Sequence, residues 1–455
     1  MAEQYLIRTF GCQMNVHDSE RIAGLLESEG MQATDELDAA DVVVLNTCCI
    51  RENADNKLYG NLGQLKALKE RKPGLRIAVG GCLAQKDRGL IQDRAPHTDV
   101  VFGTHNTASV VDLLRRSEHD GAVMEILEES DAFPSALPAR RDLPYSAWVT
   151  IQIGCDNRCA FCIVPAVRGR EISRPFEEIV AEVESLAGSG VVEVTLLGQN
   201  VNSYGRDLTR RRPLFGELLG AVGAVEGIER VRFTSPHPKD LRPETAAAMG
   251  DTPAVCEHLH LPLQSGSDGV LAAMHRGYTA DRYLERLAMA RDEVADLAVS
   301  TDIIVGFPGE SDGDFERTLE VVAAAEYDSA YTFLFSPRPG TEAAGFADRF
   351  VPPAVATERF ARLTVVVERS ALLKHQARVG RIESVLVEGP SRKDASVLTG
   401  RTRQNKLVHF TAEPLAPGTF ARVRVTAAAP HHLLGELVEV TARPRHKTRI
   451  PVAAL

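Results

Sequence analysis

Six of the eight cysteines in this 455-residue chain fall into two sets that each follow predicted β-strands. The first set is spread along the chain, at Cys12, Cys48 and Cys82. The second set is a C-x3-C-x2-C loop made by Cys155, Cys159 and Cys162. Clustered cysteines in a reducing compartment favour metal binding or catalysis over disulfides. The chain must therefore fold so that six thiols gather at two places.

Strand-like and helix-like segments alternate in the first part of the chain. Apolar runs typical of buried parallel strands lie at residues 4–9, 41–45, 75–79 and 99–102, and helical patterns lie at 17–29 and 52–69. This alternation predicts an α/β fold, with a doubly wound parallel-sheet domain at residues 1–128.

Further segments follow this first domain. Three prolines, Pro134, Pro138 and Pro144, predict a linker at residues 129–144. Residues 145–370 carry six strand candidates separated by helical segments, which predicts a partial (βα)6 barrel. The candidates lie at 148–153, 191–197, 230–234, 258–261, 298–305 and 329–335, and a closing helix lies at 358–377. Short β-rich pieces predict a small β-barrel at 371–440, followed by a tail at 441–455.

The first cysteine set belongs to the predicted parallel sheet. In such a sheet the carboxyl ends of the strands share one edge, so Cys12, Cys48 and Cys82 are expected to converge there. Gly11 and Gly81 would let the backbone come close to a bulky group. Three thiolates without a fourth suit an iron–sulfur cluster with one open iron better than zinc. Three buried apolar cysteines are the alternative. Cys49, next to Cys48, is expected to point elsewhere.

The second set follows the first strand of the predicted barrel. Its loop can wrap three thiolates around one cubane and leave the fourth iron open, whereas a structural zinc site usually takes four protein ligands. An open iron beside a barrel mouth can chelate a substrate through an amino and a carboxylate group. S-adenosylmethionine offers that pair.

A family resemblance rests on these cysteines and on motifs along the chain. The loop, with Phe161, reads C-x3-C-x-F-C and resembles that of the radical S-adenosylmethionine superfamily. Nearly all of residues 4–440 resemble its methylthiotransferase branch, and most closely the tRNA-modifying MiaB type. The segments that carry the resemblance are 9–15, 45–48, 51–54, 79–85, 103–106, 195–200, 263–266, 306–310 and 335–340. Gly-Cys-Gln-Met-Asn at 11–15 points to the MiaB type, and Cys49 departs from the family pattern.

The resemblance implies a radical reaction with two 4Fe-4S clusters. The cluster at Cys155, Cys159 and Cys162 would cleave S-adenosylmethionine to a radical that takes a hydrogen from an aromatic carbon. The cluster at Cys12, Cys48 and Cys82 would hold a sulfur that a second S-adenosylmethionine methylates. The implied substrate is N6-isopentenyladenosine at position 37 of tRNA, methylthiolated at C2. Whether the sulfur comes from a sacrificed cluster or from added sulfide stays open.

Residues at the ends of the barrel strands are candidates for binding the cofactor. By resemblance, Gly198, Gln199 and Asn200 would meet its methionyl amino group, and the turn at Gly306, Gly309 and Glu310 would lie on the adenine side. The remaining candidates are Phe161, Ser235, His237 and Gln264. Ordinary β–α turns and loop packing are the alternatives for these positions.

The charge is divided unevenly along the chain. The net charge of −10 argues against general coating of nucleic acid, yet residues 371–455 carry 14 basic and 6 acidic side chains. A basic small barrel suits phosphate contact, and the region resembles the TRAM domain. The expected RNA contacts are Arg338, Arg392, Lys393, Arg401, Arg403, Lys406, His409 and Phe410. A charged solvent face without a ligand is the alternative.

The expected setting follows from the same features. Met1 to Phe10 lack the pattern of a signal peptide, and no apolar stretch approaches the ~20 residues of a membrane span. We expect a cytoplasmic monomer that binds the anticodon stem-loop of tRNA and takes electrons from a donor such as flavodoxin or ferredoxin. The rival interpretations are a sister methylthiotransferase acting on threonylcarbamoyl-adenosine or a ribosomal protein, and a non-catalytic iron–sulfur or zinc RNA-binding protein.

Overall fold

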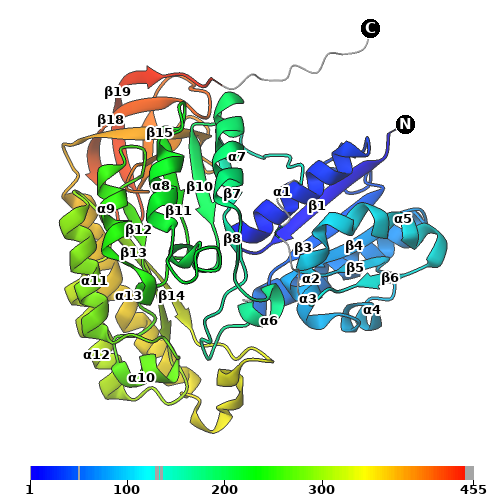
Figure 1. Cartoon of the computed structure of the whole chain (residues 1–455), viewed down its shortest axis with the longest axis horizontal. Coiled ribbons are helices and arrows are strands. Elements are labelled where there is room, and N and C mark those ends of the chain that lie inside the picture. Colours follow the sequence, from blue (N-terminus) through cyan, green and yellow to red (C-terminus); the bar gives the residue numbers. More distant parts are fainter. Residues whose placement is uncertain (1, 50–51, 129–132, 134–136, 446–455) are drawn as a thin grey trace.

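A computed structural model describes residues 2–49, 52–128, 133 and 137–445 of the chain. Figure 1 shows an N-terminal α/β domain beside a central domain, with a small β-barrel at one end of the central domain. The α/β class, the parallel N-terminal sheet and the C-terminal barrel are confirmed. Much of the predicted linker, at 129–132 and 134–136, lies outside the described residues, as does the tail from 446 onward.

The N-terminal domain is a six-stranded sheet in the order β2-β1-β3-β4-β5-β6, and every pairing is parallel. Its strands are β1 (Gln4–Phe10), β2 (Gln32–Ala33), β3 (Val42–Thr47), β4 (Arg76–Gly81), β5 (Val100–Phe102) and β6 (Val123–Glu125). The sequence pattern missed β2 and β6, because these short edge strands lack an apolar run.

Helices cover both faces of this sheet, as the doubly wound prediction requires. The helices are α1 (Gln13–Ser28), α2 (Glu52–Arg71), α3 (Cys82–Asp87), α4 (Leu90–Arg94), η1 (Thr104–Ser109) and α5 (Val110–Asp120). Alternate residues of β3 divide between two cores: Val43 packs with α2, α3 and α4, whereas Val42 and Val44 pack with α1 and α5. This alternation explains why β3 is a continuous run of buried residues.

The central domain is a partial barrel of six parallel strands arranged as two sheets. The sheets have the orders β11-β10-β7 and β12-β13-β14, and a bridge between Val231 and Val255 links them. The strands are β7 (Ser146–Thr150), β10 (Glu193–Leu197), β11 (Arg230–Phe233), β12 (His258–His260), β13 (Ala298–Val305) and β14 (Ser329–Leu334). Each predicted strand is present, although residues 152–153 leave the first one to form β8 (Gln152–Ile153), which pairs with β9 (Ile172–Ser173).

Helices and short 3-10 turns connect these strands. They are α6 (Val164–Arg168), α7 (Phe176–Gly188), η2 (Val201–Ser203), α8 (Phe215–Gly223), η3 (Pro238–Asp240), α9 (Pro243–Asp251), α10 (Asp268–Ala273), α11 (Ala280–Glu293), α12 (Asp312–Ala325), η4 (Glu342–Gly345), η5 (Ala347–Arg349) and α13 (Pro353–Gln376). Helix α13 continues past the expected domain boundary at 370, since its buried residues Leu363, Val367 and Ala371 follow a helical period.

The C-terminal domain is a closed barrel in the order β15-β16-β17-β19-β18. Its strands are β15 (Ile382–Pro390), β16 (Leu398–Thr402), β17 (Leu407–Thr411), β18 (Phe420–Ala428) and β19 (Leu433–Ala442). Side chains that alternate along these strands fill its core, among them Val385, Val408 and Val423.

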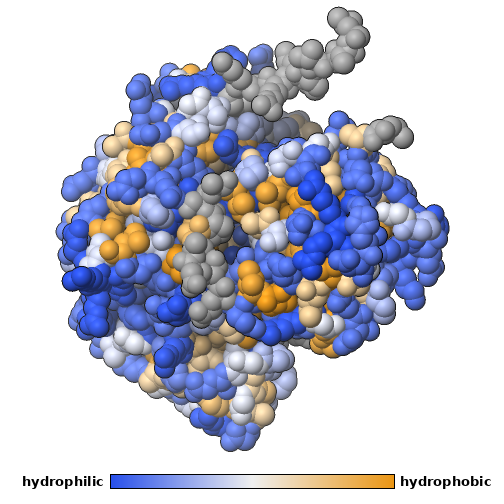
Figure 2. All heavy atoms as spheres, turned by 45° about the vertical axis from the view of Figure 1, so that its right-hand side comes forward, coloured by the Kyte–Doolittle hydropathy of each residue, from blue (hydrophilic) through white to orange (hydrophobic). Residues whose placement is uncertain are grey.

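The visible surface is largely hydrophilic, with hydrophobic residues in small groups (Figure 2). Within the described part of the chain, no helix is long and apolar enough to cross a membrane.

Candidate functional site

Three thiols of the N-terminal domain stand at the carboxyl edge of its sheet. Cys12 is the N-cap of α1, directly beyond β1, and Cys82 is the first residue of α3, directly beyond β4. Cys48 follows β3, and its amide donates to the Phe10 carbonyl over 2.8 Å. Because β1, β3 and β4 are neighbours, the sheet brings these residues to one edge, as the sequence predicted. We call this set the auxiliary site.

The thiols at the carboxyl edge of the sheet influence one another's pKa values. A hydrogen bond from Cys48 is the main cause that lowers the pKa of Cys12. A hydrogen bond from Cys49 likewise lowers the pKa of Cys82. The expectation that Cys49 points elsewhere is therefore wrong: it is buried in the same apolar cluster as Cys82. The site has four neighbouring thiols rather than three.

Two asparagines that the sequence analysis missed hold the auxiliary site in shape. Asn46, at the end of β3, donates to the Asn15 carbonyl over 2.8 Å and to Ser19 Oγ over 2.9 Å, so it ties β3 to α1. A Cβ at Gly11 would collide with Asn15, and one at Gly81 would collide with Asn46. These glycines therefore make room for the asparagines.

The second set lies on a loop between β8 and β9, which we call the loop site. Gly154 starts the loop with φ +74°, and a Cβ there would overlap the Arg170 carbonyl. The amide of Cys162 donates to the Cys159 carbonyl over 3.0 Å. Ala160, between these cysteines, donates to the Met274 carbonyl and accepts from the Ala343 amide. The three cysteine residues are partly exposed.

Among the described residues, no three Cys, His, Asp or Glu side chains stand close enough to hold one metal ion.

A buried arginine contacts the loop site. Arg276, just beyond α10, donates from Nη1 to Cys159 Sγ over 3.2 Å and from Nε to the Tyr278 hydroxyl over 3.2 Å. It is 6% exposed. No sequence pattern points to Arg276, because only the tertiary fold brings it to the cysteine loop.

Buried polar oxygens gather beyond the carboxyl ends of β7 and β10. Among the described residues, Gln152 Oε1, Gln199 Oε1 and Asn200 Oδ1 are buried acceptors with no hydrogen-bond partner. A buried acceptor left unsatisfied costs about 1–3 kcal/mol, so a ligand that donates hydrogen bonds would relieve that cost. The amino and hydroxyl groups of S-adenosylmethionine are such donors.

A cavity of about 310 Å³ opens beside these groups. It lies between the cysteine loop and the β10 end, and Asp156, Asn157, Glu171, Asn200, Arg206, Asp207, Arg211 and Lys239 line it. Burial raises the pKa of Glu171 to about 7. The sequence analysis found only Asn200 among these lining residues.

The other predicted cofactor residues are Ser235, Gln264, His237, Phe161 and Gly198, and each has a distinct setting. Ser235 and Gln264 adopt φ +60° and +68°, a conformation that costs energy outside glycine and that clusters at functional sites. His237 is buried, and burial with the charge of Arg276 lowers its pKa to about 2. Phe161 packs against a small apolar cluster around Met274 and Phe307. Gly198 is closely packed against Val201 and Gln152.

The turn after β13 is held by Glu310. Gly306 and Gly309 have positive φ, as their predicted turn requires. Glu310 Oε2 accepts from the Gly306 amide over 3.1 Å, and Oε1 accepts from Arg359 over 2.8 Å. Glu310 therefore stabilises the turn, and its contact with the cofactor stays a prediction.

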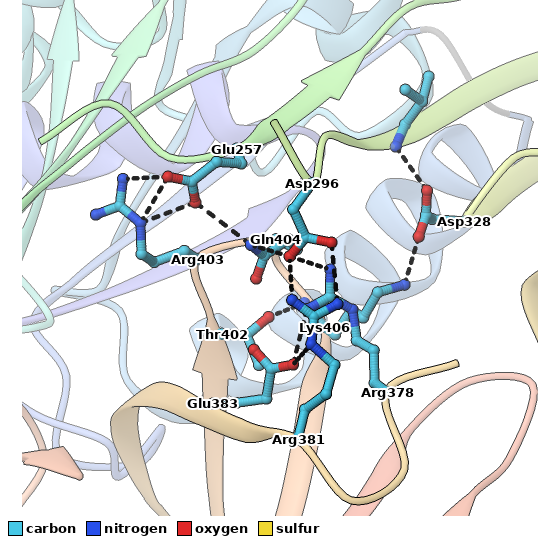
Figure 3. A network of polar contacts seen from close by, with 11 residues as sticks. Glu257, Asp296, Asp328, Arg378, Arg381, Glu383, Thr402, Arg403, Gln404 and Lys406 are labelled. Carbon is cyan, nitrogen blue, oxygen red and sulfur yellow. Dashed lines mark hydrogen bonds and ion pairs between the residues drawn. The ribbon is translucent and has the colours of Figure 1, made fainter. Parts of the chain in front are cut away.

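Three predicted RNA contacts take part in packing inside the protein. Figure 3 shows Arg403 directed at Glu257 and Lys406 directed at Asp328. The distances are 2.7 Å and 2.6 Å. Lys406 is 4% exposed and Phe410, in the barrel core, is 2% exposed, so the prediction of RNA contact is wrong for these two residues. Arg403 is partly exposed, and its RNA contact stays a prediction.

The same contact shows where the barrel is attached. Arg378 and Arg381 share Asp296 with Gln404 (Figure 3). Glu257, Asp296 and Asp328 precede β12, β13 and β14, so the barrel packs on the amino-terminal ends of these strands. Cofactor residues of such barrels gather at the opposite, carboxyl ends.

The remaining RNA candidates lie on the surface or partly so. Arg392 and Lys393 are exposed in the β15–β16 connection. Arg401 is half-buried and pairs with Glu388 over 2.9 Å, and His409 shares a hydrogen bond with Thr399. Arg338 is half-buried beyond β14.

Helix α6 joins the two cysteine sites. It starts directly after the loop site, and its residue Val167 packs in the same apolar cluster as Cys49 and Cys82. The Thr104 hydroxyl donates to the Val167 carbonyl over 2.6 Å, which fixes α6 against η1. A helix of the central domain is thus part of the N-terminal core.

Family models match all three domains. The uncharacterized protein family UPF0004 matches residues 4–103, the radical SAM superfamily matches 149–322, and the TRAM domain matches 376–438.

Curated relatives match nearly the whole chain. A protein of Salinispora arenicola named tRNA-2-methylthio-N(6)-dimethylallyladenosine synthase is 54% identical, over 97% of this chain and 92% of its own. A protein of Kineococcus radiotolerans with the same name is 55% identical, over 95% and 88%. Among solved structures, the radical S-adenosylmethionine methyltransferase TsrM of Kitasatospora setae has a TM-score of 0.53 at 14% identity, covering 73% of each chain, which is a likeness of fold.

Proposed function

The chain belongs to the tRNA-2-methylthio-N(6)-dimethylallyladenosine synthase family, and from that premise we propose that its two cysteine sites serve one reaction. It is a tRNA methylthiotransferase of the radical S-adenosylmethionine type. In the reaction we propose, the methylthio group is placed on C2 of N6-isopentenyladenosine at position 37, and two molecules of S-adenosylmethionine are used.

The loop site would hold the cluster that the radical SAM superfamily implies, through Cys155, Cys159 and Cys162. The auxiliary site would hold a second cluster through Cys12, Cys48 and Cys82. When bound, the two clusters supply an electron for cleavage of S-adenosylmethionine and a sulfur for insertion.

The protein's own residues orient the cofactor and exclude water. The orphan oxygens of Gln152, Gln199 and Asn200 would accept hydrogen bonds from S-adenosylmethionine. Ser235, His237 and Gln264 would border it at the neighbouring strand ends. His237 is neutral at every working pH, because burial lowers its pKa to about 2, so it can accept or donate a hydrogen bond without adding charge.

One observation carries the proposal that the sites cooperate. Helix α6 begins at the loop site and packs beside Cys82, so the thiols of both sites lie at the two ends of one short helix. A reaction that needs both a radical and a sulfur donor requires such proximity.

The RNA would approach from the surface rather than through the interdomain contact. Arg392 and Lys393 are exposed on the barrel and suit phosphate contact, and Arg401, His409 and Arg338 are secondary candidates. A target base in the anticodon stem-loop would have to be splayed out to enter the barrel mouth. We further propose a cytoplasmic monomer that takes electrons from a flavodoxin or ferredoxin.

Anaerobic turnover tests this function. The protein is incubated with isopentenylated tRNA, S-adenosylmethionine and a reductant, and digested nucleosides are analysed by mass. The expected result is a gain of one methylthio group on the isopentenyladenosine. A gain only on threonylcarbamoyl-adenosine or on a ribosomal protein would contradict the proposal, and so would a colourless protein that contains zinc.

A further inference from the structure

Each cysteine site has one buried arginine that is not part of the cysteine motif. Arg168, the last residue of α6, is 6% exposed, and its neighbour Val167 packs in the same apolar cluster as Cys82. Arg276 is also 6% exposed and contacts the loop site. Long charged side chains are almost never fully buried unless something nearby compensates the charge. Asp18 compensates the charge of Arg168, whereas the polar groups beside Arg276 are Cys159 Sγ and the Tyr278 hydroxyl.

Arg168 is fixed between the two domains. Its Nη2 donates to Asp18 Oδ2 over 2.6 Å, and both side chains are largely buried. Asp18 belongs to α1, whose N-cap is Cys12. The salt bridge therefore connects the end of α6 to the helix that positions the first thiol of the auxiliary site.

Arg168 belongs to the packing that surrounds the auxiliary site. Its neighbour Val167 packs in the same apolar cluster as Cys49 and Cys82, and its partner Asp18 lies on α1, whose N-cap is Cys12. A cation and an anion held at one place act on a nearby cluster with opposite signs.

Arg276 acts on the loop site by direct contact. Its guanidinium donates to Cys159 Sγ, and Tyr278 holds its other edge. The Tyr278 hydroxyl in turn donates to the carbonyls of Pro262 and Leu263 at the barrel end. Among the described residues, Arg276 forms no ion pair with a carboxylate, so its charge is directed at the sulfur.

We propose that Arg168 and Arg276 are positioning residues that each set the reduction potential of one cluster, Arg168 that of the auxiliary cluster and Arg276 that of the radical cluster. The inference rests on the proposed function, since it requires two clusters. Reduction adds negative charge to a cluster, and a buried cation favours the more negative state. Hydrogen bonds to sulfur and nearby charge are known determinants of cluster potential. Each arginine therefore raises the potential of its own cluster.

A redox titration of the reconstituted full-length protein, followed by electron paramagnetic resonance, tests the division. Arg168→Gln should lower the potential of the auxiliary cluster and leave the radical cluster unchanged, whereas Arg276→Gln should do the reverse. We expect a roughly tenfold change in the reduction equilibrium, which is about 59 mV for a one-electron couple. Arg168→Lys and Arg276→Lys keep the charge and should recover part of each shift.

Variants of Asp18 protect the test against simple loss of structure. Arg168→Gln leaves a buried carboxylate without its partner, which can prevent folding. Asp18→Asn keeps the arginine and removes the opposing charge, so it should raise the auxiliary potential. A double variant, Arg168→Gln with Asp18→Asn, keeps a neutral hydrogen-bonding pair and should stay near the wild-type potential. A purely structural role would not give shifts of opposite sign.

Two results would overturn the inference. In the first, the wild type holds two clusters, but Arg168→Gln and Asp18→Asn change neither reduction potential, or change the potentials of both clusters equally. The second is a wild type that binds about four irons instead of about eight, which removes the auxiliary cluster and with it the proposed function. The iron content of the wild type thus separates failure of the inference from failure of the function.

Discussion

The loop site comes from one stretch of chain, residues 155–162, whereas the auxiliary site draws its thiols from the ends of three strands. The loop site is shaped by local backbone contacts and a glycine with positive φ. The auxiliary site depends on sheet order, on Asn46 and on a helix from another domain. A site within one short segment can therefore be predicted from cysteine spacing. The geometry of a site built from several strands depends on how those strands and the neighbouring helices pack.

The sharpest test of this comparison replaces one thiol in each site. Cys159→Ala should abolish formation of 5′-deoxyadenosine, because the loop site loses one of three ligands. Cys48→Ala should still allow that cleavage but stop sulfur insertion into the tRNA. Chromatographic assay of 5′-deoxyadenosine and mass analysis of nucleosides measure both outcomes. Equal loss of cleavage in two folded variants would show that the sites do not divide the work.

The fourth thiol offers a second test, with Cys48 and Cys49 as matched neighbours. Cys49 is buried in the same apolar cluster as Cys82 and is expected to stay outside the ligand set. Cys49→Ala should therefore keep about eight irons per chain, whereas Cys48→Ala should keep about four. Chemical analysis of iron and sulfide in each purified variant measures the number of irons per chain. Retention of eight irons by Cys48→Ala would mean that Cys49 can ligate in its place.

Burial of Glu20 on α1 should also make the free energy of unfolding depend on pH. Burial raises the pKa of Glu20, on α1, from 4.5 to about 7. The folded state thus favours the protonated form, so stability should fall as pH rises from about 4.5 to 7 and then level off. Glu20→Gln should remove this dependence and add about 1–3 kcal/mol at pH 8. Urea unfolding at pH 5 and pH 8 measures it, and an unchanged pH slope would contradict the assignment.

The smallest expected effect separates exposed from buried basic residues on the C-terminal barrel. Arg392→Gln with Lys393→Gln should weaken tRNA binding several-fold and make its salt dependence shallower by about two charges. Lys406→Met, the control, should change thermal stability but leave the salt slope as it is, because Lys406 pairs with Asp328. Binding curves at several salt concentrations distinguish them. A reduced slope for Lys406→Met would place that residue on the RNA after all.

The same contrast explains where sequence reasoning succeeded. Strand–helix alternation located the six barrel strands, because each is a short apolar run between helical segments. It missed β2 and β6, since short edge strands carry little apolar signal. It counted Arg403 and Lys406 as a basic surface, because spacing along the chain does not show that Glu257 and Asp328 lie opposite them.

The sequence by itself determined the fold class, the loop site and the three residues that make the auxiliary edge, because hydrophobic period and cysteine spacing are local properties. Only the tertiary structure decided that Cys49 faces Cys82, that Glu310 is held by Arg359, and that Arg168 and Arg276 each reach one cysteine site. These contacts join residues far apart in the chain, and their energies come from burial and charge that exist only once the domains have packed.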